Sequence, residues 1–311
     1  VLGKLLLKYM PGLQNLLAYD KSWLKHDIKA GLSVAAVALP VAIAYAELAG
    51  VGAIVGLYSC VLPMIAYALF GSSRQLIVGP DATTCAVIAA VVFPLSAGNP
   101  ELHWQLTIVM TLMMGGWCLL ASKFHLGALA DLLSHPILTG LLNGVAVTII
   151  VGQLGKVLGI KLDEAQVIEK ILALPGRLLD SHVLTIGISL LTLIILMVIK
   201  TYRSHWPAPL IAIVITTILV WGTSAQQYGI ATIGGNGFQP GLPVVNWGAF
   251  QPGPMRELVI PALNLALVSF VSLMLTARSF AAKNGYEINA DAEFRALGIA
   301  NIMSGLSQGF A

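Results

Sequence analysis

The sequence predicts an all-α polytopic membrane protein, and three observations support this fold class. The chain has 311 residues, of which 57% are hydrophobic. Only 10% of the residues are charged, whereas soluble domains carry about 25%. The mean hydropathy is +0.86. Because so few charged side chains cannot cover the surface of a soluble protein of this length, we expect helices that cross a lipid bilayer.

Apolar runs close to the length that crosses a bilayer recur along the chain. Residues 1–30, which carry five lysines, are predicted as a cytoplasmic interfacial segment. Residues 31–222 are predicted to hold spans one to seven, and 257–311 spans eight and nine. Between them, 223–256 is rich in Gly and Pro and is predicted as an extracellular or periplasmic loop. The nine predicted spans are 31–49, 53–70, 79–97, 104–121, 135–152, 183–199, 208–222, 257–276 and 292–310.

The distribution of Lys and Arg predicts the orientation in the membrane. With the N-terminus in the cytoplasm, most of the 17 basic residues fall in inside segments. The outside segments then hold only Lys156, Lys161, Lys170, Arg177 and Arg256. We therefore predict a multi-pass protein of the cell (inner) membrane with a cytoplasmic N-terminus.

The composition also argues against several functions. The net charge is +3 and no long basic run is present, so nucleic acid is not an expected partner. The six histidines are scattered, with no pair at metal-ligand spacing on one helix face. The three cysteines lie inside apolar runs, where packing is the expected role. We expect no metal and no cofactor.

The start of the third predicted span carries the sequence Gly79-Pro80-Asp81. Proline favours the first turn of a helix, and glycine allows another backbone to approach closely. If this start lies at membrane depth, the free N–H groups and the positive end of the helix dipole form an anion site. Alternatively, Asp81 caps a helix at the membrane surface. The residues alone leave both interpretations open.

Two other predicted spans carry polar groups. In the first span, Pro40 frees a backbone carbonyl, and Tyr45 and Glu47 follow. Glu47 is either a carboxylate within the span, which is a candidate for function, or a residue at the outer interface. In the eighth span, Ser272 and Thr276 are i, i+4 neighbours on one helix face. Their hydroxyls either contribute to a site or bond within the helix bundle.

Several stretches together resemble the sulfate permease family (SulP, or SLC26, anion transporters). The most specific is residues 26–84, "HDIKAGLSVAAVALPVAIAYAELAGVGAIVGLYSCVLPMIAYALFGSSRQLIVGPDATT". The stretches "SHPILTGLLNGVAVTIIVGQLGKVLGI", "WPAPLIAIVITTIL" and "ARSFAAKNGYEINADAEFRALGIANIMSGLSQGF" resemble the fifth, the seventh, and the eighth and ninth spans of that family. The resemblance covers nearly the whole chain.

The resemblance implies a transport domain of two inverted halves of seven spans each (a UraA/SLC26-like, 7+7 inverted-repeat fold). Spans three and ten would be half-helices whose N-termini face each other across the anion. A core bundle (spans one to four and eight to eleven) would move against a gate bundle. This chain holds about nine of the spans and stops before the tenth span and the cytoplasmic STAS domain.

The resemblance also implies site residues. The anion position after "GP" falls on Asp81, with Ala82 and Thr83 supplying neighbouring N–H groups. The first-span positions fall on Val41 and Tyr45, although some members have glutamine at the position of Val41. In the eighth span, a position that is acidic in some members falls on Ser272, and its companion hydroxyl falls on Thr276. The missing carboxylate at Ser272 argues against a sodium site there.

The resemblance implies a secondary active anion transporter, not an enzyme, with an elevator-like alternating-access mechanism. Together with the carboxylate of Asp81 at the anion position, it leads us to expect sulfate uptake by proton symport. Asp81 is the expected proton carrier and Glu47 the alternative. The expected partners are a small anion (sulfate, bicarbonate or a dicarboxylate), protons or sodium, the lipid bilayer and a second copy in a homodimer. A sodium-coupled bicarbonate or C4-dicarboxylate transporter is the main alternative. A passive channel and an intramembrane enzyme are further alternatives, but no nucleophile–base pair is recognisable.

Overall fold

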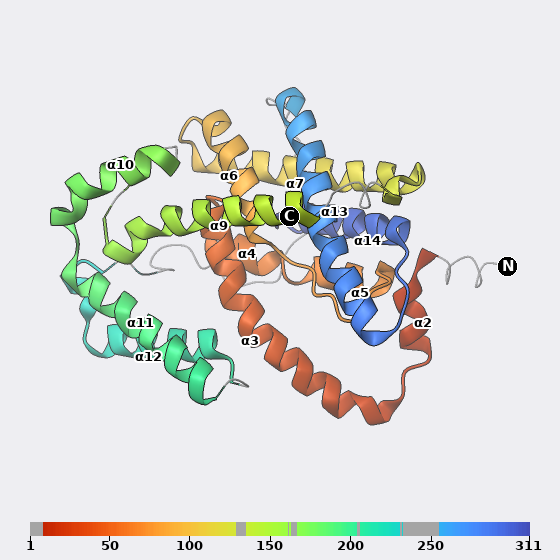
Figure 1. The fold of residues 1–311 in the computed structure, drawn as a ribbon, viewed down its shortest axis with the longest axis horizontal. Helices are drawn as coiled ribbons and strands as arrows, with labels where there is room; N and C mark the ends of the chain where they lie inside the picture. Colours follow the sequence, from red (N-terminus) through yellow and green to blue (C-terminus); the bar gives the residue numbers. More distant parts are fainter. Residues whose placement is uncertain are drawn as a thin grey trace. The chain divides into compact units, whose positions relative to one another are not determined.

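The computed structural model describes residues 9–128, 135–160, 162, 167–203, 206–230, 232 and 255–311. Within these ranges the regular secondary structure consists of helices, without a strand. The predicted all-α fold class is therefore confirmed. Figure 1 shows the helices in chain order.

Each of the nine predicted spans contains helical structure. Among the described residues, two shorter α-helices lie outside them, α2 (Pro11–Leu17) and α10 (Val167–Arg177). The helices within the predicted spans are α3 (Leu24–Leu48), α4 (Ala53–Tyr58), α5 (Leu62–Phe70), α6 (Ala82–Ser96), α7 (Pro100–Lys123), α9 (His135–Leu158), α11 (Val183–Tyr202), α12 (Ala208–Gly222), α13 (Met255–Asn284) and α14 (Ala290–Leu306).

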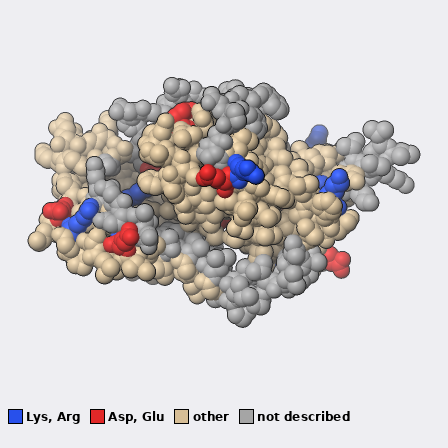
Figure 2. All heavy atoms as spheres, turned by 90° about the horizontal axis from the view of Figure 1, so that it is seen from above, with Lys and Arg blue, Asp and Glu red and all other residues tan. Residues whose placement is uncertain are grey.

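Five helical segments of the described residues are long and apolar enough to cross a membrane: Lys21–Leu48, Ala53–Phe70, Pro100–Lys123, Val183–Tyr202 and Met255–Asn284. Two further apolar helices, α6 and α12, are shorter. Figure 2 shows one face of the molecule, on which charged side chains of the described residues are few and lie among uncharged ones. Such a surface suits contact with lipid tails, because burying a charged side chain in hydrocarbon is costly.

Helix boundaries differ from the predicted spans in two places. Helix α3 begins at Leu24, inside the range predicted as an interfacial segment, and continues through Pro40. The second predicted span, 53–70, is divided into α4 and α5. Pro63 stands in the first turn of α5, where the missing N–H of proline is tolerated. Most of the predicted loop 223–256 lies outside the described residues.

The chain divides into two compact units. The first consists of Val1–Lys29, Val41–Thr139 and Gln239–Ala311, and the second of Ala30–Pro40 and Gly140–Phe238. In the second unit, α11 packs against α12. His182 caps α11 by accepting a hydrogen bond from the N–H of Thr185, and its own N–H bonds the carbonyl of Leu158 at the end of α9.

In the first unit, α7 and α14 pack against each other over most of their length. Helix α14 also packs against α5, and α13 packs against α7 and α6. The rings of Phe270 on α13 and Phe294 on α14 are stacked, and both are almost fully buried. The core around them is apolar and includes Ile88, Met110 and Leu265.

Glycines bring the backbones of α7 and α14 together. A Cβ atom on Gly115 would lie 2.8 Å from the carbonyl oxygen of Gly298, and one on Gly298 would lie 2.9 Å from that of Gly115. Gly305 approaches Leu112 in the same way, with 2.6 Å to the side chain. Small residues at helix contacts allow this close approach in membrane proteins. We call the contact of Gly115, Gly298 and Gly305 with the facing helix the glycine contact.

We expect Gly115→Ala to destabilise the protein, because the added methyl group must displace the backbone of α14. Overpacking of this kind costs about 1–3 kcal/mol. The neighbouring Gly116 has no atom within 4 Å of its Cβ position, so Gly116→Ala is a matched control that should be neutral or slightly stabilising. Thermal unfolding of the detergent-solubilised full-length protein measures both. Equal melting temperatures for the two variants would contradict the glycine contact.

Candidate functional site

Asp81 caps helix α6 at the Gly79-Pro80-Asp81 break. Its Oδ1 accepts hydrogen bonds from the backbone N–H groups of Thr83 (2.8 Å) and Thr84 (2.9 Å). Its Oδ2 accepts a hydrogen bond from the hydroxyl of Thr84. An aspartate at this position satisfies N–H groups that lack partners within the helix. In this conformation, the carboxylate therefore occupies the positive end of the helix dipole.

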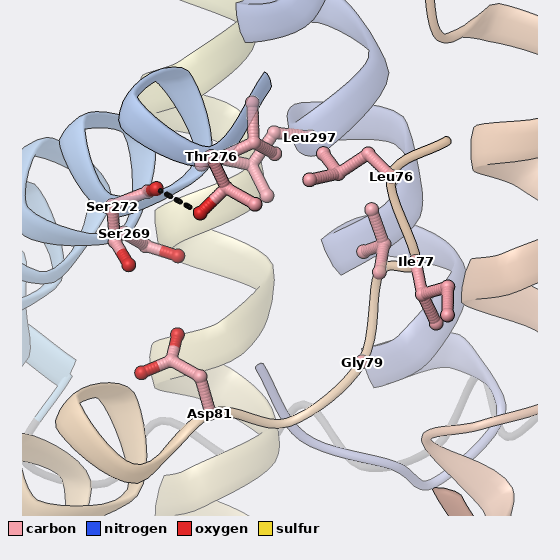
Figure 3. A pocket seen from close by; sticks show the side chains of 10 residues that line it. Leu76, Ile77, Gly79, Asp81, Ser269, Ser272, Thr276 and Leu297 are labelled. Atoms are coloured by element: carbon pink, nitrogen blue, oxygen red, sulfur yellow. Dashed lines mark hydrogen bonds between the residues drawn. The ribbon is translucent and has the colours of Figure 1, made fainter. Parts of the chain in front are cut away.

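A cavity of about 180 Å³ lies beside this cap (Figure 3). It is smaller than the pockets of roughly 300–1,000 Å³ that hold drug-sized ligands, so its size suits a small ion. Two segments far apart in the sequence supply most of its lining, and α14 adds Leu297. The segments contribute Leu76, Ile77, Val78, Gly79 and Asp81 on one side and Ser269, Ser272, Leu273 and Thr276 of α13 on the other.

A second cavity of about 20 Å³, close to the space one water needs, shares Asp81, Ser269 and Leu297 with the first. It extends along α14 past Asn301 and Ser304. The cap of α6 therefore lines both cavities.

Hydroxyl groups of α13 are the hydrogen-bond donors on the side of the cavity opposite the cap. Within the described part of the chain, the hydroxyls of Ser269 and Ser272 have no hydrogen-bond partner. In Figure 3 they lie on the side of the cavity toward which the carboxylate of Asp81 points. The hydroxyl of Thr276 donates to the backbone carbonyl of Ser272 at 3.2 Å. Two hydroxyls can thus donate to a ligand without breaking an internal bond.

Among the described residues that line the cavity, none carries a positive charge. Attraction for an anion must therefore come from hydroxyls, backbone N–H groups and the dipole of α6. Asp81 opposes that attraction while it is ionised, because a carboxylate repels an anion.

The structure brings together three of the residues predicted for the site, namely Asp81, Ser272 and Thr276. Of the others, Tyr45 lies close enough to Asp81 to interact with it electrostatically, although it is not among the residues that line the cavity. Thr83 is buried, and its N–H bonds Asp81 rather than facing the cavity.

The remaining predicted residues, Val41, Glu47 and Ala82, are half-buried and do not line the cavity. Val41 and Glu47 belong to α3, and Ala82 begins α6. The roles of all these residues as anion or proton ligands stay predictions.

Sequence reasoning missed Leu76, Ile77, Val78, Leu297 and the buried Glu293. Ser269, which lies in the eighth predicted span, was not assigned to the site. Glu293 lies within the ninth predicted span, and an ionisable residue in a span is itself a signal of function. For 76–78 and Leu297, no local signal exists, because apolar residues near a span are ordinary.

Comparison with known proteins supports the family resemblance. The model of the sulfate permease family matches residues 24–311. A protein of Mycobacterium tuberculosis named as a probable sulfate transporter is 37% identical over 302 residues, which cover 97% of this chain and 54% of that protein. Sulfate transporter 2.1 of Arabidopsis thaliana is 29% identical, over 94% of this chain and 45% of that protein. The chain spans about half the length of these curated relatives.

Solved structures share the fold. The structure of SLC26A9 matches 99% of this chain and 52% of its own chain, with a TM-score of 0.90 and 20% identity. The transmembrane domain of BicA, a cyanobacterial bicarbonate transporter, matches 94% of this chain and 74% of its own, with a TM-score of 0.81 and 26% identity. On the match of the family model over nearly the entire chain, this protein belongs to the sulfate permease family.

Proposed function

We propose that the full-length protein is a secondary active anion transporter that takes up sulfate together with protons. The named functions of the relatives support sulfate as the substrate. The observation that carries the proposal is the cavity between the cap of α6 and the hydroxyls of α13. It combines a helix N-terminus, free hydroxyl donors and a carboxylate in a space that suits a small anion.

The hydrogen bonds of Asp81 provide a way to couple the proton to the anion. Ionised Asp81 repels an anion and occupies the N–H groups of Thr83 and Thr84. When a proton binds the carboxylate, the negative charge is lost and the carboxyl group becomes a weaker acceptor, so these N–H groups become available to the anion. Anion and proton then bind together, as symport requires. Glu47 on α3 is the alternative carrier.

We also propose an elevator-like movement. Its support is the division of the chain into two compact units. The first unit contains α4 to α7, α13 and α14, which correspond to the core spans expected from the resemblance. The second contains α10 to α12 and nearly all of α9. We further propose that the protein lies in the cell (inner) membrane with a cytoplasmic N-terminus and works as a homodimer in the lipid bilayer.

Uptake of radiolabelled sulfate into proteoliposomes that contain the full-length protein tests the function. We expect uptake against a sulfate gradient when an inward proton gradient is imposed, and little uptake without it. A passive channel would equilibrate sulfate but could not concentrate it. The absence of sulfate uptake under both conditions would overturn the proposed substrate.

Sodium-coupled uptake of bicarbonate or a C4-dicarboxylate is a second candidate function. The structural likeness to a bicarbonate transporter favours it. The same proteoliposomes, loaded with an inward sodium gradient and offered bicarbonate or fumarate, separate the two candidates. Sodium-dependent flux would favour this alternative over proton symport.

A further inference from the structure

Glu293 is a fully buried carboxylate on the first turn of α14. Its Oε2 accepts a hydrogen bond from the hydroxyl of Tyr67 on α5, at 2.6 Å. Its Oε1 accepts hydrogen bonds from the N–H of Ser72 (2.8 Å), the hydroxyl of Ser72 (2.6 Å) and the N–H of Ser73 (3.2 Å). An ionised carboxylate only accepts hydrogen bonds, and all four of these contacts are donors.

Three of the four donors belong to the segment that leads from α5 to the cavity. We call residues 71–80, between α5 and the cap of α6, the connector. It has no regular secondary structure, so its course depends on contacts with its neighbours. Its first residues bond Glu293, and its last residues, with Asp81, line the cavity. The position of the cavity wall is thus linked to Glu293 through a few residues of chain.

Tyr286, which lies just before α14, makes a second attachment of the connector. Its hydroxyl donates to the side-chain oxygen of Gln75 at 2.6 Å and lies 3.2 Å from the hydroxyl of Ser73. This attachment is more exposed than that of Glu293. Because buried bonds to a charged group are stronger than exposed bonds between neutral groups, Glu293 is the main anchor.

The next turn of the same helix face reaches the cavity. Leu297 lies one turn after Glu293 on α14 and lines the cavity beside Asp81. Helix α14 therefore anchors the start of the connector through Glu293. Through Leu297 it also lines the cavity that the end of the connector lines. Glu293 itself does not line either cavity.

We propose that Glu293 is a positioning residue for anion binding, which fixes the connector so that Gly79 and Asp81 face the hydroxyls of α13. This inference rests on the proposed function, because it assumes that the cavity binds the transported anion. Loss of the anchor lets the connector move, and the anion then meets donors that are no longer in place. A displacement of the binding groups by about 1 Å is enough to reduce the efficiency of a site strongly.

Kinetics of sulfate uptake by the full-length protein in proteoliposomes test the effect on the site. For Glu293→Ala we expect the KM for sulfate to rise roughly tenfold, with a smaller change in the maximal rate per folded transporter. Glu293→Gln should change KM less, because the amide oxygen still accepts from Ser72 and Ser73 while the amide N–H donates to Tyr67. Glu287→Ala, at an exposed position close by in the sequence, is the matched control and should leave KM unchanged.

The mobility of the connector is measured without any anion. A nitroxide spin label on Ile77→Cys reports it, because Ile77 is exposed and lines the cavity. The described native cysteines Cys60, Cys85 and Cys118 are buried and should not react. We expect the label to shift from an immobilised to a mobile spectrum in Glu293→Ala, but not in Glu287→Ala. A label on Leu120→Cys of α7 should keep the same spectrum in both variants.

Ser72→Ala covers the case in which Glu293→Ala fails to fold, since it removes one donor and leaves the others. An intermediate gain of label mobility is expected. If neither Glu293→Ala nor Ser72→Ala changes the mobility at Ile77, or if KM is unchanged while sulfate is transported, the positioning role is refuted. If mobility rises but the unsubstituted protein transports no sulfate, the anchor is confirmed, and the proposed substrate fails.

Discussion

Asp81→Asn is expected to leave helix α6 capped but to make sulfate uptake independent of the proton gradient. Asparagine is as good an N-cap as aspartate, and its side-chain oxygen can accept the N–H groups of Thr83 and Thr84. The amide is neutral at every accessible pH, so it neither repels the anion nor carries a proton. Like protonated Asp81, it is a weaker acceptor than a carboxylate, so the anion can compete for these N–H groups. Initial rates of radiolabelled sulfate uptake, measured from outside pH 5 to 8, test this expectation.

Glu47→Gln separates the two candidate proton carriers. If Asp81 carries the proton, uptake by Glu47→Gln keeps its dependence on acidic outside pH, whereas uptake by Asp81→Asn loses it. If Asp81→Asn takes up sulfate with unchanged dependence on outside pH, the proton role of Asp81 is refuted. Asp81→Ala serves as the capping control, because loss of the cap alone costs about 0.5–2 kcal/mol of stability.

Ser272→Asp is expected to reduce the affinity for sulfate by about a hundredfold. The new carboxylate would stand in the same cavity as Asp81 and would replace a hydroxyl that has no hydrogen-bond partner within the described part of the chain. The new carboxylate would repel the bound anion. For two unit charges about 6 Å apart, at an effective dielectric constant of about 20, this repulsion is roughly 3 kcal/mol, which corresponds to about a hundredfold in affinity. Concentration-dependent sulfate uptake measures the effect.

Two control variants separate the effect of the new charge in the cavity from the loss of the hydroxyl and from a charge elsewhere on α13. Ser272→Ala removes only a hydroxyl donor and should raise KM by far less than Ser272→Asp. Ser279→Asp adds the same charge to an exposed position of α13 and should leave KM unchanged. If Ser272→Asp binds sulfate as well as the unsubstituted protein does, the anion does not occupy this cavity. Sodium-dependent uptake by Ser272→Asp would indicate that the two carboxylates now hold a cation.

The local features of the site could be predicted from the sequence because the groups involved are close along the chain. Asp81 and the N–H groups that donate hydrogen bonds to it lie within four residues. Gly79-Pro80-Asp81 alone therefore indicates a helix start. The positions of the helices could be predicted from apolar runs because these runs are also local features of the sequence. The first residue of α3 was harder to predict from the sequence. The first turns of this helix carry charged residues, and a search for long apolar runs excludes them.

The contacts that complete the site could not be predicted in this way. Glu293 and Ser72 are separated by 221 positions, and no spacing rule links them. Ser269 and Ser272 face Asp81 across the cavity from a helix in another part of the chain. Such pairs depend on how helices pack, which is decided by contacts such as Gly115 with Gly298 rather than by local pattern.

The glycine contact also has a practical consequence for measuring motion. Helices whose backbones touch cannot slide or separate without opening a gap along the whole contact. A pair of fluorophores on the outer faces of α7 and α14 should therefore keep a constant distance throughout the transport cycle. Such a pair provides a fixed reference distance. The change in distance between fluorophores on any other two helices can be compared with it in single-molecule measurements.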